Sequence, residues 1–354
     1  MFVFILLIIL LVVQGQVVRN RNAYLILAFV ELTLVSGFRL PVLDIGSDTE
    51  KYCDLYSQYK YFSWSDFASF HSEIGFDFLC YILYGISSSP KFLVFSTQLL
   101  MNASILYVIK KKSNIAWLSV VLYITLMFYF SAMNLMRFCL SISILLFTIE
   151  PVKNRKFLKF FFLLLVAISL HFSSIIFLPL YFLYPLRCNM KNCLIVSIPI
   201  LGLSISLMTV FSILLLISPH YAAYGTDGEF YSSSFANILI FALNLFCLLF
   251  IIKNNNTSPI FYRGDDKFFF WCIFLSVVFA LVGIKIMMAV RFVWLFSIFE
   301  VIMLPNVISR IINYTKRLRW IFVWLLITIL QVVVILTFRP EWYGILPYKN
   351  WLFN

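Results

Sequence analysis

Side chains that bind phosphate or carry protons recur at the ends of hydrophobic segments in the first half of this chain. The stretch 36-SGFRLPVLDIGSDTEKYCDLY-56 places Arg39 and Asp48 after one such segment. Arg137 lies within apolar sequence, and His171 interrupts a long apolar run. A guanidinium binds phosphate bidentately and stays charged, while imidazole and carboxylate groups accept protons. The sequence therefore predicts a site for a phosphate-containing ligand with candidate bases beside it.

A second set of polar and aromatic residues also lies at the ends of hydrophobic segments. Carboxylates accept hydrogen bonds from sugar hydroxyls, and aromatic rings pack against pyranose rings, so this set suits a carbohydrate. An arginine in apolar sequence also has a simpler interpretation, because its stem can lie in lipid while its charge reaches water. Both interpretations are open for Arg137 and Arg291. The second set consists of Tyr52, Glu73, Asn134 and Tyr221.

The composition indicates that membrane-spanning helices position these residues. Hydrophobic residues make up 63% of the 354-residue chain, charged residues 12%, and the mean hydropathy is +0.98, whereas soluble domains are about half apolar. Apolar runs of about 15–25 residues recur along the chain, as bilayer-spanning helices require. No polar segment is long enough to form its own core. We therefore expect one all-α polytopic domain over residues 1–354, with FVFILLIILLVV near its start as a retained helix.

The distribution of charge predicts the orientation of these helices. The formal net charge is +12, but the basic residues are dispersed among the apolar runs, which favours the positive-inside rule over a nucleic-acid partner. The opposite, outer side then holds the periplasmic loops 39–74 and 219–234 and the tail 339–354. The predicted cytoplasmic clusters are Arg19/Arg21, Lys110–Lys112, Lys153/Arg155/Lys156/Lys159, Arg187/Lys191, Lys253/Arg263/Lys267 and Arg310/Lys316/Arg317/Arg319.

Consistent sidedness requires about twelve crossing segments, with both termini outside. The short segment 75–88 is predicted to be an interfacial or re-entrant helix at the outer side. The run 157–185 is too long for one span. We expect it to break at residues 171–174, with Ser173 or Ser174 capping the second helix. These features bring the candidate residues to one side of the membrane.

Other ionisable groups point to structural roles. Seven cysteines lie mostly inside apolar runs without a C-x-x-C pair, so neither a disulfide framework nor a metal site is expected. No cofactor is predicted. Glu31 and Glu300 lie within predicted helices, where pairing with arginines is the expected role. The residues alone leave open an envelope transferase and a transporter whose polar groups line a permeation path.

Four short motifs follow one another in the first half: 37-GFRLPVLDIGSDTEKY-52, 73-EIGF-76, 134-NLMRFCLSISI-144 and 167-AISLHFSSIIFLP-179. In this order they resemble the EpsG-like family of polysaccharide polymerases, which includes O-antigen polymerases of the Wzy type. The family commonly has Gln where this chain has Phe138, and Pro where it has Ile74. The second half matches only loosely, through Arg291 and Pro347–Tyr348.

The resemblance implies a membrane-embedded glycosyltransferase, similar in fold to the GT-C type, in the bacterial inner membrane with its active site facing the periplasm. It would transfer a glycan from undecaprenyl pyrophosphate to the non-reducing end of a lipid-linked repeat unit. A chain-length regulator protein would be a partner. The implied pyrophosphate ligands are Arg39, Arg137 and Arg291. The candidates for the base are His171, Asp48 and Glu73, and the candidates for acceptor binding are Tyr52, Asn134 and Tyr221.

The alternative is a lipid-linked oligosaccharide flippase or another polysaccharide-export transporter. Such proteins have similar hydropathy but are expected to show repeats between their two halves, and we detect none in this sequence. A membrane-bound acyltransferase would need a histidine in a cytoplasm-facing cavity, whereas His171 is predicted on the outer side.

Overall fold

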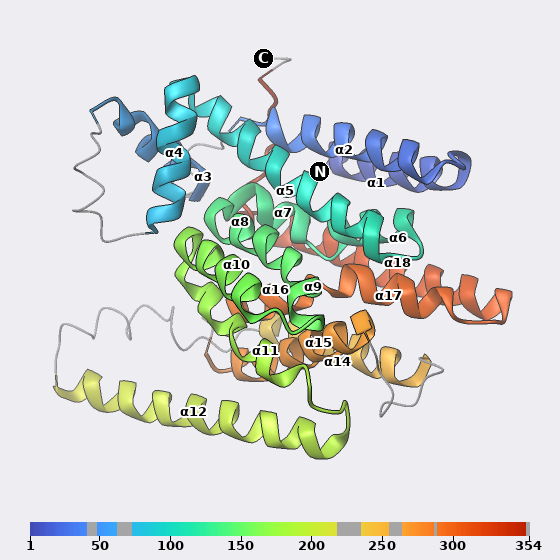
Figure 1. Cartoon of the computed structure of the whole chain (residues 1–354). Helices are drawn as coiled ribbons and strands as arrows, with labels where there is room; N and C mark the ends of the chain where they lie inside the picture. Colours follow the sequence, from blue (N-terminus) through green and yellow to red (C-terminus); the bar gives the residue numbers. More distant parts are fainter. Residues whose placement is uncertain (41–47, 62–72, 218–234, 255–263, 287–288, 352–354) are drawn as a thin grey trace. The chain divides into compact units, whose positions relative to one another are not determined.

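The computed structural model is built almost entirely of helices (Figure 1). Within the described residues no β-sheet forms, and the one strand-like pairing is an antiparallel bridge between Arg39 and Asn350. The predicted all-α class is therefore confirmed. The structure describes residues 1–40, 48–61, 73–217, 235–254, 264–286 and 289–351, and it describes the backbone alone at 207–217 and 341.

The chain divides into two compact units, residues 1–151 with 156–175 and 311–354, and residues 152–155 with 176–310. The first unit contains α1 (Phe2–Val17), α2 (Arg21–Gly37), α3 (Asp48–Gln58), α4 (Ile74–Ile86), α5 (Pro90–Lys112), α6 (Ala116–Thr125), α7 (Phe128–Asn134), α8 (Met136–Leu145), α10 (Phe157–Leu170) and α18 (Tyr314–Phe338). The second contains α11 (Pro179–Leu183), α12 (Met190–Ile217), α14 (Phe235–Asn254), α15 (Gly264–Gly283), α16 (Ala289–Ser297) and α17 (Glu300–Ser309). The segments α9 (Ile149–Lys153) and η4 (Phe172–Phe177), a 3-10 helix, pass from one unit to the other.

Local sequence starts several of these helices. The side chain of Asn20 accepts a hydrogen bond from the backbone N–H of Asn22 at the start of α2. Asn313 does the same for Lys316 at the start of α18. Side-chain oxygens at these positions satisfy donors that have no partner within the helix. Pro90 opens α5, where its missing N–H costs nothing.

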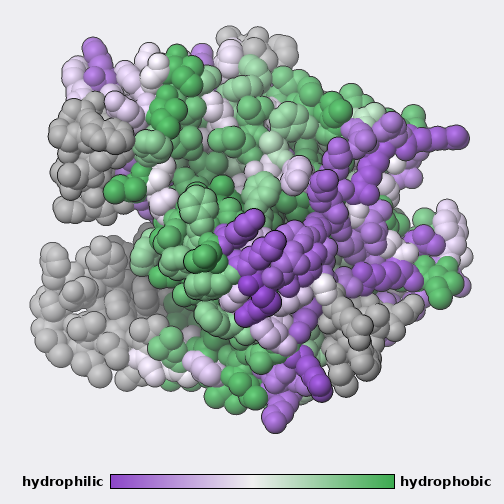
Figure 2. All heavy atoms as spheres, viewed as in Figure 1, coloured by the Kyte–Doolittle hydropathy of each residue, from purple (hydrophilic) through white to green (hydrophobic). Residues whose placement is uncertain are grey.

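The length and composition of the helices indicate a membrane protein. Among the described residues, four helices are long and apolar enough to cross a bilayer, namely α5, α14, α15 and α18. Two bent pairs, α6 with α7 (52°) and α16 with α17 (42°), raise the number to six if each pair is one span. Hydrophobic residues cover much of the face shown in Figure 2. The predicted count of about twelve crossings stays a prediction.

Two predicted local features are present. The segment predicted at 75–88 forms the separate 13-residue helix α4, and its place at the membrane interface stays a prediction. The long run beginning at Phe157 breaks at His171, which ends α10. The predicted capping by Ser173 or Ser174 is wrong, because neither hydroxyl has a hydrogen-bond partner. The chain instead continues as the 3-10 helix η4.

Several helices of the first unit run between the same two opposite ends of that unit. Nη2 of Arg21, at the start of α2, donates to the carbonyls of Ile109 (3.0 Å) and Lys110 (2.9 Å) near the end of α5. The other ends of α2 and α18 meet where Arg39 pairs with Asn350. Figure 1 shows α3 and α4 at that end and the α1–α2 turn at the opposite end.

We call the end at the α1–α2 turn the basic end. Its cationic residues are Arg19, Arg21, Lys110, Lys111, Lys112, Lys156, Lys159, Lys316, Arg317 and Arg319.

Candidate functional site

Three charged side chains from separate parts of the first unit meet at Glu73. Glu73 precedes α4, Arg137 lies in the first turn of α8, and His171 follows α10. Nη1 of Arg137 lies 3.1 Å from Oε2 of Glu73. Nδ1 of His171 contacts Oε1 of the same carboxylate, and the backbone N–H of Phe172 donates to that oxygen over 3.2 Å. We call Glu73, Arg137 and His171 the charged triad.

The charged triad depends on a close approach of α4 to α10. Gly75 packs against Ser169, and a Cβ added at Gly75 would lie 2.2 Å from Oγ and 2.8 Å from the carbonyl carbon of Ser169. Any side chain at this position would force the two helices apart. Glycine here lets Glu73 come within reach of His171, two residues beyond Ser169.

Aromatic rings surround the charged triad. The guanidinium carbon of Arg137 lies 4.9 Å from the ring centroid of Tyr52 and 5.8 Å from that of Phe76, a favourable cation–π arrangement. The ring of Phe138 meets the imidazole of His171 edge to face, with centroids 5.3 Å apart. These rings fix the directions of both side chains and lower the local dielectric, which strengthens electrostatic contacts.

The surroundings keep Glu73 ionised. Burial opposes its charge, but the hydrogen bond and charge of His171, the charge of Arg137 and the Phe172 N–H outweigh burial and hold the pKa of Glu73 below its ordinary value. The side chains are 16% exposed for Glu73, 18% for His171 and 30% for Arg137. A carboxylate so held is a weak base. Its geometry suits orienting the imidazole and the guanidinium.

A second network connects Arg39 to the helices beside the triad through Thr49. Nη2 of Arg39 donates to Oγ1 of Thr49 over 3.1 Å, and this hydroxyl donates to the carbonyl of Met133 over 2.7 Å. The backbone N–H of Asp48 donates to Oδ1 of Asn134 over 3.0 Å. Because Asn134 ends α7 immediately before α8, this network adjoins the charged triad.

Arg39 is a buried cation, with 4% of its surface exposed. Its Nε has no hydrogen-bond partner, and no carboxylate within the described part of the chain forms an ion pair with it. Burial lowers its pKa to about 10, so it remains protonated at neutral pH. A buried charge without a counter-charge is costly, and an anionic ligand offsets that cost.

The C-terminal segment holds the backbone on both sides of Arg39. The N–H of Leu40 donates to the carbonyl of Lys349 over 2.9 Å, and the N–H of Trp351 donates to the carbonyl of Phe38 over 3.0 Å. The rings of Phe38 and Trp351 also pack together, with centroids 4.7 Å apart. The C-terminal tail is thus part of the scaffold that positions Arg39.

The structure brings most of the predicted site residues together. Arg291 lies exposed on α16 in the second unit, and its role stays a prediction. Tyr221 lies outside the described residues. The residues found in or beside the charged triad and the Thr49 network are Glu73, Arg137, His171, Tyr52, Arg39, Asp48 and Asn134.

Sequence reasoning missed Thr49, which is 1% exposed and joins Arg39 to α7. Its signal was its place directly after Asp48 in the quoted motif. The contact of the C-terminal tail with Arg39 has no comparable local signal, because more than 300 residues separate the paired positions.

The predicted pairing of two intrahelical glutamates with arginines is wrong. Glu31 on α2 contacts Nε2 of Gln14 on α1. Glu300, 2% exposed, interacts with Cys247 on α14. In both places a neutral polar partner from the neighbouring helix takes the position that we assigned to an arginine.

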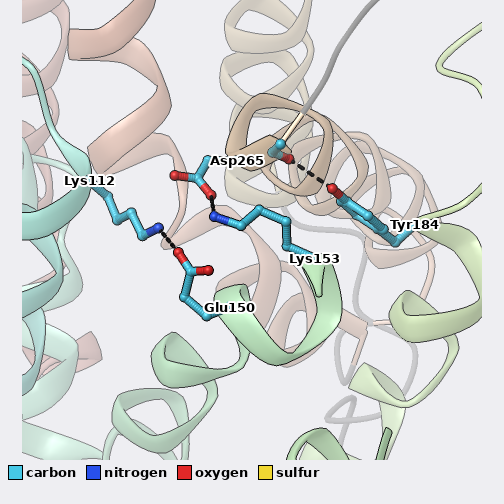
Figure 3. A network of polar contacts seen from close by, with 6 residues as sticks. Lys112, Glu150, Lys153, Tyr184 and Asp265 are labelled. Atoms are coloured by element: carbon cyan, nitrogen blue, oxygen red, sulfur yellow. Dashed lines mark hydrogen bonds and ion pairs between the residues drawn. The ribbon is translucent and has the colours of Figure 1, made fainter. Parts of the chain in front are cut away.

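Ion pairs also join segments within each unit (Figure 3). In the second unit Nζ of Lys153 lies 3.1 Å from Oδ1 of Asp265, at the start of α15, where the helix dipole favours a carboxylate. The hydroxyl of Tyr184 donates to the carbonyl of Gly264 over 3.3 Å. Both contacts hold the start of α15 against neighbouring segments of the second unit. Over the described ranges, no three His, Cys, Asp or Glu side chains are grouped as a metal site would require.

Comparison with protein families matches residues 22–350 to the model described as EpsG family. Comparisons with curated proteins and with solved structures gave no match. The predicted likeness to GT-C-type glycosyltransferases therefore stays a prediction.

Proposed function

The chain belongs to the EpsG family, and from this membership we propose that it is a Wzy-type polysaccharide polymerase of the bacterial inner membrane. It transfers a glycan from undecaprenyl pyrophosphate to the non-reducing end of a lipid-linked repeat unit at the periplasmic face. The observation that carries the proposal is the charged triad, in which one carboxylate contacts both a potential base and a phosphate-binding guanidinium.

The arginines stabilise the leaving group. The acceptor oxygen bonds to the anomeric carbon while the bond from that carbon to the diphosphate oxygen breaks, so negative charge collects on the diphosphate. A preorganised guanidinium in a site of low dielectric stabilises such charge strongly. Arg137 and the buried Arg39 supply two cations in the first unit. Arg291 is the third guanidinium that we propose as a diphosphate ligand.

His171 accepts the proton of the acceptor hydroxyl. Its Nδ1 faces the carboxylate of Glu73, which leaves Nε2 as the nitrogen that can accept a proton. Glu73 stays ionised and stabilises the imidazolium that forms, as the carboxylate does in a Ser-His-Asp triad. This arrangement favours His171 over Glu73 as the base.

Asp48 suits a role in acceptor binding better than the role of general base. Its side chain is 36% exposed, and Nζ of Lys51 lies 3.8 Å from its carboxylate, so water and lysine screen it. With Tyr52 and Asn134 it offers an aromatic face, an amide and a carboxylate. We assign these three residues to the hydroxyls and ring of the acceptor sugar.

The lengths of the helices between the charged triad and the basic end support the proposed sidedness. α2 has 17 residues and α5 has 23, which gives lengths of roughly 25–35 Å. The hydrocarbon core of a bilayer is about 30 Å thick. If the basic end is cytoplasmic, the charged triad faces the periplasm.

The proposal is tested with lipid-linked repeat units taken from producing cells that lack this protein. Arg137→Ala is expected to reduce the polysaccharide ladder to single-unit products, because charge on the leaving diphosphate loses its stabiliser. His171→Gln is expected to lower turnover by about 10²–10⁴-fold, the usual contribution of a general base. Ladder length on gels and turnover of purified protein are the measurements.

Arg19→Ala, at the basic end, is the matched control and should give normal ladders. Membrane levels of all variants are compared by immunoblot. Full ladders from both Arg137→Ala and His171→Gln contradict the assignment of the charged triad to polymerisation.

A further inference from the structure

The basic end of the first unit carries a concentration of charge that the proposed reaction does not use. Its ten cationic side chains come from the α1–α2 turn, the end of α5, the start of α10 and the start of α18. Among the described residues of this unit, one carboxylate lies near them, Glu150, which forms an ion pair with Lys112 (Figure 3). No ion pair among the described residues involves the other nine cations of this end.

The segments of the basic end are fixed to one another. Nη2 of Arg21 donates to the carbonyl of Ser113 over 2.6 Å as well as to the two carbonyls at the end of α5. Gly15 on α1 packs against the Cβ of Trp117 on α6. α18 packs on α6 as well, and its far end continues into the tail that pairs with Arg39, so its start lies away from the charged triad. Figure 2 shows hydrophilic residues gathered around the α1–α2 turn and the end of α5.

The cationic side chains are accessible. Lys110, Lys111 and Lys316 are exposed, and no ion pair engages them within the described ranges. Such a surface attracts anions, and the attraction falls as salt increases.

Exposed apolar side chains are interleaved with these cations. Ile312 is 88% exposed and Tyr314 67%, immediately before Lys316, and Leu158 is 81% exposed between Lys156 and Lys159. An acidic soluble partner matches the charges but leaves such side chains in water. The headgroup region of a bilayer matches both, because phosphates and acyl chains lie next to each other there.

We propose that the basic end is a binding site for anionic phospholipids. The headgroup phosphates contact Lys110, Lys111 and Lys316, and the first acyl carbons pack against Ile312 and Leu158. The site is independent of the polymerase reaction and lies at the other end of the helices from the charged triad.

The test uses the full chain purified in a neutral detergent. Phosphatidylglycerol and phosphatidylcholine with the same acyl chains are titrated separately, and the midpoint of thermal unfolding is followed. A ligand that binds the native state raises that midpoint. We expect phosphatidylglycerol to raise it and phosphatidylcholine to leave it unchanged, with the effect reduced at high salt.

The triple variant Lys110→Gln/Lys111→Gln/Lys316→Gln should need about a hundredfold more phosphatidylglycerol for the same shift, since each basic residue near an anionic surface contributes about a fivefold factor. Lys110→Gln alone should need about fivefold more, and this variant serves if the triple variant folds poorly. The matched control is Lys60→Gln/Lys91→Gln/Lys349→Gln, which removes three exposed lysines outside the basic end and should respond like the unmodified chain.

Three results would overturn the proposal. Equal responses to the two lipids would remove the preference for anionic headgroups. An equal loss in the control triple variant would show that general charge, not this site, is responsible. An equivalent shift with inorganic phosphate would identify a site for free phosphate in place of lipid.

Discussion

The carboxylate of Glu73 lies between two side chains, Arg137 and His171, that would repel each other if both were charged. Without its carboxylate, Arg137 and a protonated His171 would be two cations in one half-buried place, and like charges at short range disfavour one another. With the carboxylate, both are held at fixed positions. Substituting Glu73 therefore removes the contacts with Arg137 and His171 as well as the acceptor of the Phe172 N–H, and donors left without an acceptor increase the cost.

Glu73→Gln keeps the shape of this side chain and removes its charge. Its pKa in the folded state lies below the ordinary value of 4.5, so its contribution to stability is present above about pH 4.5 and is lost as pH falls through the lowered pKa. We expect the variant to be less stable at pH 7 by about 1.5–3 kcal/mol, the range for hydrogen bonds to charged groups. The part of the acid-induced loss of stability that is due to protonation of Glu73 should be absent from the Glu73→Gln variant.

Thermal unfolding of the purified protein at pH 7, 5 and 4 measures both effects. The unmodified chain should lose part of its stability between the two lower values, and the variant should lose less. An identical loss in both proteins would show that Glu73 is not held ionised by its neighbours.

At the scale of helices, local signals were predictable and long-range contacts were not. Hydropathy predicts α5, α14, α15 and α18 because each buries or exposes a continuous apolar run. The break at His171 follows from the length of one run. The meeting of α4 with α10, in contrast, depends on residues about 95 positions apart and leaves no periodic pattern. The motifs place Glu73 and His171 in order along the chain without showing that they touch.

The packing of α4 on α10 can be tested at one glycine. Gly75→Ala improves helix propensity by up to about 1 kcal/mol, but its methyl group would meet Ser169 at 2.2–2.8 Å. Overpacking of this kind costs about 1–3 kcal/mol, so we expect a net loss of stability and a loss of polymerising activity as Glu73 moves away from His171. Thermal unfolding and ladder length measure the two effects.

Gly85→Ala is the matched control, because Gly85 lies on the same helix with nothing within 4 Å of an added Cβ. This change should leave activity intact and stabilise the protein slightly. Equal behaviour of the two variants would show that the close approach of α4 to α10 is not needed.

At the scale of the molecule, the charged triad and the basic end lie at opposite ends of the first unit, about one helix length apart. The charged triad, the buried Arg39 and the C-terminal tail occupy one end, and the uncompensated cations occupy the other. Charge counting along the sequence predicts this separation, because the basic residues of α2, α5, α10 and α18 are concentrated toward one end of each helix.

We propose that the basic end of the first unit faces the cytoplasm, and this orientation can be tested with single cysteines. Six of the seven native cysteines are buried, and Cys193 is half-buried, so Cys193→Ser gives a background of low reactivity toward a membrane-impermeant maleimide. Lys60→Cys lies near the charged triad and Lys110→Cys at the basic end, and both lysines are exposed. With intact spheroplasts we expect labelling of Lys60→Cys alone, because the positive-inside rule keeps the basic end in the cytoplasm. Permeabilisation should then allow labelling of Lys110→Cys. The reverse pattern would place the charged triad in the cytoplasm, where a reaction at the periplasmic face is impossible.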